Sequence, residues 1–83
     1  MMLSAKQLVD MVQRYLEPHQ SKDYRLNVVA DGIRQDDDWW YVVVQPDKGD
    51  IRAYDYAARL SEAEQDLQDK EHLNVLLVPV MPN

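Results

Sequence analysis

Apolar residues recur at helical spacing near the start of the chain. The residues at i, i+3, i+4, i+7 and i+8 of this pattern are Leu8, Met11, Val12, Tyr15 and Leu16. Ser4 and Gln7 have the spacing of a capping box, which satisfies the free N–H groups at a helix start. Pro18 disfavours helical geometry at Glu17. The pattern therefore predicts a helix from about Ser4 to Glu17.

A second, narrower helical stripe lies in the second half of the chain. It consists of Tyr56, Leu60, Ala63 and Leu67. Most other residues from Asp55 to Lys70 are charged or polar, so this helix should expose most of its circumference. Asp50 or Asp55 is the expected N-cap, because Asp is favoured at that position.

Three segments have the pattern of β-strands. Tyr24 to Arg34 alternates between two faces, and Gly32 within it indicates a bulge or bend. The predicted faces are Leu26, Val28 and Ala30 on one side, and Asn27, Val29, Asp31 and Ile33 on the other. Trp39 to Gln45 is rich in β-branched and aromatic residues, and Gln35 to Asp38 is the turn before it. Leu73 to Val80 is the third strand.

These elements predict one α+β domain, residues 1–83, of order α-β-β-α-β: a three-stranded sheet, made of a β-hairpin plus the C-terminal strand, with two helices packed on one face. The third strand can lie beside the first, where every neighbour is antiparallel, or beside the second and parallel to it. We expect the first of these orders. Pro79 has no N–H, which predicts a strand end or a sheet edge.

The second strand is apolar on both of its faces, although two helices can cover only one face of a three-stranded sheet. Trp40, Val42 and Val44 alternate with Trp39, Tyr41 and Val43. Either termini and loops cover the second face, or a strong twist of the sheet hides it, or that face is an interface. The simplest interface is a two-fold homodimer that packs sheet on sheet or extends the sheet edge to edge.

Net charge excludes some partners and favours others. The chain carries −6, with nine basic residues against fifteen acidic ones, which argues against binding to nucleic acid or to anionic membranes. It favours a basic protein partner, although acidity also keeps small proteins in solution. The absence of cysteine and of a long apolar segment predicts a soluble, cytoplasmic protein.

No motif for catalysis, metal binding or cofactor binding is present. Asp36, Asp37 and Asp38 are consecutive and lack the Gly and Glu of a calcium loop, so we interpret them as a solvated turn. His19 and His72 each stand alone and are expected in loops. The two glycines are too isolated for a phosphate-binding loop. We therefore expect no cofactor and no enzymatic activity.

Three functional hypotheses remain open. The first is a non-enzymatic protein-interaction module that self-associates through its sheet, with a surface that includes Trp39, Tyr41 and Val43, the acidic turn Asp36 to Asp38, and Arg52 and Tyr54. The second is an acidic inhibitor, such as an immunity protein or antitoxin, that binds a basic protein. The third is a small enzyme or ligand-binding protein that uses the loop of Arg52, Tyr54 and Asp55.

Overall fold

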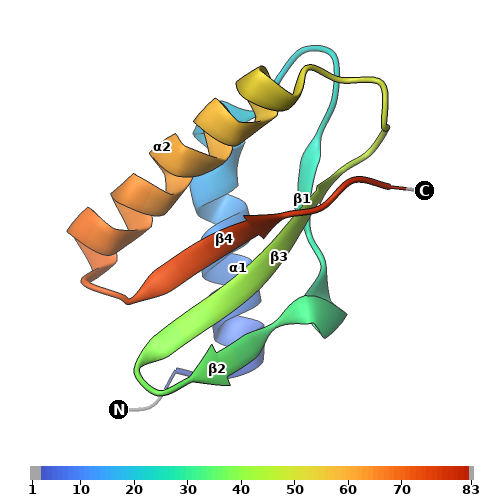
Figure 1. Cartoon of the computed structure of the whole chain (residues 1–83). Helices are drawn as coiled ribbons and strands as arrows, with labels where there is room; N and C mark the ends of the chain where they lie inside the picture. The colour runs from blue at the N-terminus through green and yellow to red at the C-terminus, as the bar shows by residue number, and fades with distance from the viewer. Residues whose placement is uncertain (1–2, 83) are drawn as a thin grey trace.

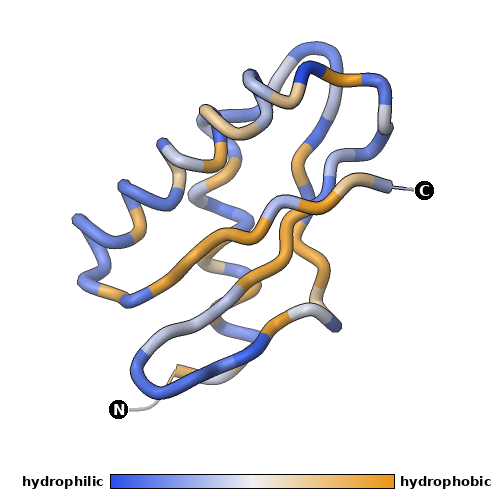
Figure 2. Tube along the Cα trace, in the orientation of Figure 1, coloured by the Kyte–Doolittle hydropathy of each residue, from blue (hydrophilic) through white to orange (hydrophobic). Residues whose placement is uncertain are grey.

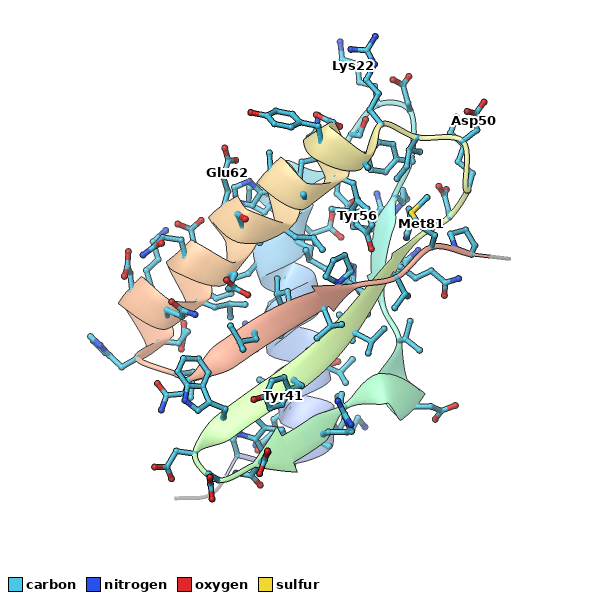
Figure 3. All side chains as sticks on the ribbon, viewed as in Figure 1. Lys22, Tyr41, Asp50, Tyr56, Glu62 and Met81 are labelled. Carbon is cyan, nitrogen blue, oxygen red and sulfur yellow. The ribbon has the colours of Figure 1, made fainter. Side chains whose placement is uncertain are left out.

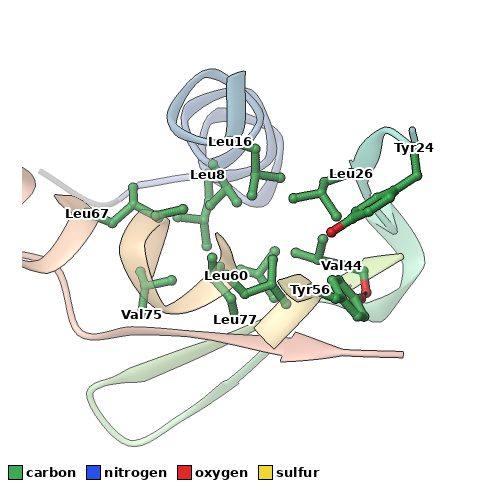
Figure 4. Packing of buried hydrophobic residues seen from close by; sticks show 13 residues of the cluster. Leu8, Leu16, Tyr24, Leu26, Val44, Tyr56, Leu60, Leu67, Val75 and Leu77 are labelled. Atoms are coloured by element: carbon green, nitrogen blue, oxygen red, sulfur yellow. Dashed lines mark hydrogen bonds between the residues drawn. The ribbon is translucent and has the colours of Figure 1, made fainter. Parts of the chain in front are cut away.

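A mixed sheet and two helices form the fold, which a computed structural model describes for residues 3–82 (Figure 1). In chain order the elements are α1 (Ala5–Leu16), the 3-10 helix η1 (Glu17–His19), β1 (Leu26–Val28), the 3-10 helix η2 (Ala30–Gly32), β2 (Arg34–Asp36), β3 (Trp39–Pro46), α2 (Ala53–Glu71) and β4 (Val75–Pro79). In Figure 1 α1 lies behind the sheet and α2 runs beside β4, and the edge view of Figure 4 shows both helices on the same side of the sheet. The predicted α+β class, with the helices on one face, is confirmed.

The first turns of the two helices are stabilised in different ways. The Ser4 side chain accepts the Gln7 N–H and the Gln7 side chain accepts the Ser4 N–H, so the predicted capping box is confirmed. The predicted cap of α2 is wrong. Its N-cap is Arg52, without a side-chain bond, and Asp55 lies inside the first turn. There the Asp55 carboxylate is favoured by the positive end of the helix dipole.

The sheet is organised around β3, which pairs with strands on both of its edges. β1 and β2 are antiparallel to β3 and pair with one edge of it, and β4 is parallel to β3 on the other edge. The expected order, with the last strand beside the first, is therefore wrong. Two features account for this: the first strand is interrupted by η2, whereas β3 offers eight continuous residues to pair with. Pro79 ends β4, an edge strand, as predicted.

The interruption of the first strand confirms the bend predicted at Gly32 and changes the faces after it. Val29 N–H still bonds to Val43 O, and Gly32 N–H then bonds back to Val29 O, which closes the turn. Three residues in a 3-10 turn break the strict alternation of a strand. As a result Ile33 packs against the core, instead of sharing a face with Asn27 as predicted.

One hydrophobic core lies between the helices and the inner face of the sheet. Figure 4 shows the sheet from its edge, with apolar side chains filling the space between it and both helices. The core residues are Leu8, Val12, Leu16, Tyr24, Leu26, Val42, Val44, Tyr56, Leu60, Ala63, Leu67, Val75 and Leu77. Both predicted helical stripes contribute to it.

Candidate functional site

The outer face of the sheet is an apolar surface that the helices leave uncovered. Trp40, Val42 and Val44 point to the core, so Trp39, Tyr41 and Val43 point to the other side of β3. Directly opposite residues in paired strands share a face, which adds Arg34 and Asp36 from β2, and Leu76 and Val78 from β4. We call these seven residues, together with Val29, the open face.

The open face is half-exposed rather than covered. Trp39 is 37% exposed, and Tyr41, Val43, Leu76 and Val78 are each partly accessible. Figure 3 shows Tyr41 lying on the front of β3, away from the helices, and Figure 2 shows the hydrophobic colour along β4 and the second half of β3. Within residues 3–82, the element that packs on this face is η2, whose Gly32 backbone lies against Val43. Covering by loops is thus limited to one corner.

Arg34 lies against the aromatic part of the open face. Its guanidinium carbon is 5.9 Å from the centroid of the Tyr41 ring, a cation–π distance. Asp36 follows two residues later on the same face, opposite Trp39. These are the charged residues at outward-facing strand positions, so the open face is close to neutral although the chain carries −6.

The structure brings together part of the predicted surface and separates the rest. Asp36 ends β2, and Asp37 and Asp38 form the turn before Trp39, with Asp37 at φ 55°. Arg52 and Tyr54 lie at the start of α2, at the opposite end of the molecule from this hairpin (Figure 1). Tyr54 is 87% exposed. The loop before α2 does not fold back over the hairpin, so Arg52 and Tyr54 do not belong to the open face.

A polar cluster holds the start of α2 to the loop before β1. The Tyr24 hydroxyl and the Arg59 Nε (2.9 Å) both donate to Asp55 Oδ2, and Arg59 also donates to His19 O and Gln20 O. The Tyr24 hydroxyl and Arg59 hold the pKa of Asp55 below its usual value. Burial, and then the bond to Asp55, raises the pKa of Tyr24.

An open pocket of about 610 Å³ adjoins this cluster, and it contains part of the loop in the ligand-binding hypothesis. Lys48, Asp50 and Arg52 line it, together with Asp55 and Arg59. Its charges are mixed, and Asp55 and Arg59 bind each other. Asp55 and Arg59 are therefore already used by the fold.

His19 contacts α2 more closely than a loop histidine would. Its Nδ1 lies 3.1 Å from Glu62 Oε2, and its Nε2 lies 3.3 Å from Asp66 Oδ2. The two ring nitrogens point to different carboxylates, so these groups do not converge on one point. No cluster of three or more metal-ligating side chains occurs within residues 3–82.

Sequence reasoning missed several side chains that bind the sheet backbone. The Tyr56 hydroxyl lies 2.7 Å from Val44 O and 2.9 Å from Val80 O, where it joins the ends of β3 and β4. Gln13, Gln20, Glu64 and Gln68 bind backbone groups of β1 and β4. No local signal marks these residues, because polar side chains beside a helical apolar stripe are the normal surface pattern.

No family model, curated protein or solved structure matches the chain significantly. Over the described part of the chain, neither helix has the length and apolar character needed to cross a bilayer. The function has to be inferred from the surface itself.

Proposed function

We propose that this protein is a non-enzymatic interaction module that self-associates through the open face of its sheet. The observation that carries the proposal is the row of Trp39, Tyr41 and Val43, which lies opposite both helices and is joined by Leu76 and Val78. Burying one large apolar side chain is worth about 1.5–3 kcal/mol, so leaving this row of residues exposed to water is unfavourable. Aromatic residues at the centre of a patch are also the commonest anchors of protein contacts.

The charge of the open face favours a second copy as the partner. A two-fold contact places the same patch on both sides, so the patch must not repel itself. Arg34 and Asp36 balance each other on this face, whereas the remaining charge of the chain lies elsewhere. A basic partner would need an acidic patch, which the open face is not.

The size of the face predicts a weak, reversible dimer. The eight residues of β3 span about 26 Å, and three strands side by side span about 14 Å, for a projected area of about 370 Å². Stable interfaces bury about 800 Å² per partner. We therefore expect dissociation constants in the micromolar range or weaker, and a dimer that depends on concentration.

The alternative of an acidic inhibitor has weaker support. The acidic residues of α2 all lie within hydrogen-bond distance of another group in the chain: Asp55, Glu62, Glu64, Asp66, Asp69 and Glu71. They are accounted for by the fold, so they are weak evidence for a basic partner.

A cysteine-free composition fits a reducing compartment, and we propose the cytoplasm as the location.

Sedimentation equilibrium from low micromolar to near-millimolar concentration tests the proposal. The wild-type chain should show a monomer–dimer equilibrium, and replacing Trp39 and Tyr41 by Ser should abolish it. Tyr54→Ser is the matched control, because it removes an exposed aromatic ring outside the open face. A wild-type chain that stays monomeric throughout overturns the proposal, and so does a dimer that the double substitution leaves intact.

The effect of salt concentration on binding distinguishes self-association from the acidic-inhibitor alternative. Screening reduces the repulsion between two chains of charge −6, so added salt should leave the dimer unchanged or strengthen it. An acidic inhibitor would bind its basic partner less tightly as salt rises.

A further inference from the structure

The free edge of β1 is occupied by two glutamine side chains. Arg25 O accepts the N–H of Asp47, just after β3, and Val29 N–H donates to Val43 O, so the intervening residues Leu26 and Val28 direct their backbone groups away from the sheet. Gln13 of α1 donates to Leu26 O (3.1 Å) and accepts the Val28 N–H (3.1 Å). Gln20, just after η1, accepts the Leu26 N–H (2.7 Å) and donates to Leu26 O (3.0 Å). These amides stand where a neighbouring strand would bind.

The free edge of β4 is occupied in the same way from the other helix. Asn74 O and Val80 N–H bond to β3, so Val75 and Leu77 direct their backbone groups outward. Glu64 accepts the Leu77 N–H (2.8 Å), and Gln68, one turn further along α2, donates to Val75 O (3.0 Å). The last residue of the strand is a proline, which has no N–H to offer.

The third edge, that of β2, is protected by other means. β2 has three residues, all of them exposed, and it runs directly into the acidic turn. Short length and charge are common ways to prevent an edge from pairing with another chain. Each free edge of the sheet formed by residues 3–82 thus has its own obstacle to strand addition.

We infer that Gln13, Gln20, Glu64 and Gln68 are edge caps that determine how this protein can associate. They close the backbone edges of β1 and β4 to a further strand. Together with the proposed function, on which this second point rests, they leave the side chains of the open face as the route to self-contact. The four caps prevent edge-to-edge extension of the sheet, which is the other form of dimer that the sequence allowed.

The β4 edge is the one that needs its caps most. Its first four residues, Val75 to Val78, are uncharged and apolar on both faces, and an exposed apolar edge strand is prone to pair with another chain. Without Glu64 and Gln68, the Leu77 N–H and Val75 O would be free to bind the β4 of a second copy. The occupant we expect at an uncapped edge is therefore this same strand.

The test is the double variant Glu64→Ala/Gln68→Ala. At concentrations where the variant is monomeric, hydrogen exchange at the Leu77 amide should be at least about tenfold faster, because a bond to a charged acceptor is lost. Sedimentation velocity should show larger species whose amount grows with protein concentration. These species should bind thioflavin T. The matched control is Gln65→Ala/Asp69→Ala, which removes another i, i+4 pair of α2 whose members bond to each other. It should behave as wild type.

Two further variants keep the outcome decisive. Glu64→Gln retains an oxygen that can accept the Leu77 N–H, so it should stay wild type in size. If the double variant does not fold, Glu64→Ala alone removes one cap and should show the same growth to a smaller extent. A natively folded variant with a rapidly exchanging Leu77 amide and an unchanged size distribution overturns the inference.

Failure of this inference is distinguishable from failure of the proposed function. Adding Trp39→Ser and Tyr41→Ser to the double variant should leave the larger species intact, because they form through the backbone of β4. Loss of those species would mean that they form through the open face, and would overturn the edge-cap inference. A monomeric wild-type chain would instead overturn the proposed function and leave the edge-cap result standing.

Discussion

Replacing Gly32 by Ala tests the close approach of η2 to the sheet. A Cβ atom at this position would lie 2.6 Å from Val43 Cγ2 and 2.7 Å from Val43 Cβ. Ordinary contacts between carbon atoms are about 3.5–4.0 Å. Rotation of the valine can relieve the first contact but not the second, because Cβ is fixed to the backbone of β3. The turn or the strand must therefore move by close to an ångström.

The expected loss follows from two opposing effects. Overpacking of this kind costs about 1–3 kcal/mol. A Gly→Ala change also reduces the conformational entropy of the unfolded chain, which stabilises the folded state by about 0.4–1 kcal/mol. We expect Gly32→Ala to lower the free energy of unfolding by about 1–2 kcal/mol, which for a domain of this size lowers the Tm by about 5–15 °C.

The only other glycine in the chain supplies the control. A Cβ atom on Gly49 would have Pro82 O at 3.7 Å and Pro82 Cγ at 3.8 Å as its nearest neighbours, which are normal contacts. Gly49→Ala should therefore gain the unfolded-state effect alone, about 0.4–1 kcal/mol. Urea denaturation of both variants measures the difference. Equal stability of the two would refute the argument that Gly32 is required by its distance to Val43.

Three further outcomes follow from single contacts. Tyr56→Phe should cost about 1–2 kcal/mol, because its hydroxyl joins β3 to β4, whereas Tyr54→Phe should be neutral in the same urea titration. Ser4→Ala should cost about 0.5–2 kcal/mol through loss of the α1 cap, and circular dichroism during thermal unfolding would show it; an unchanged Tm would contradict this. Burial raises the pKa of Tyr24 and of Tyr56 above the usual 10.0, so the folded state holds these protons more tightly than the unfolded chain. The free energy of unfolding should then be fully present below about pH 10 and fall as pH rises through the folded pKa values, with a shallower fall in Tyr56→Phe, and a flat profile would count against the raised pKa values.

The helices were predictable because their signals are local. The Ser4–Gln7 capping box and the stripe that contains Leu60 and Leu67 depend on neighbours within two or three turns. The open face was equally predictable, since strict alternation placed Trp39, Tyr41 and Val43 on one side of a strand.

The sheet order was not predictable from the same kind of signal. It depends on which strand edges stay available after the helices have docked, and this is set by contacts across long stretches of chain. Gln13 reaches Leu26 and Val28, and Glu64 reaches Leu77. A glutamine on a helix looks the same in sequence whether it faces water or caps a strand. The position of Arg52 and Tyr54, far from the hairpin, depended in the same way on the path of a loop.

The parallel pairing of β3 with β4 also sets the order of events as the chain is made. β3 is the central strand, yet one of its edges is completed only by residues 75–79, which follow α2 in the chain. A nascent chain that has just produced α2 therefore holds β3 with one edge unpaired. Contacts between residues so far apart in sequence form slowly, and partly folded chains tend to aggregate through exposed apolar strand edges. Glu64 and Gln68, the α2 side chains that cap β4, precede that strand in the chain, so they are made before the edge that they protect.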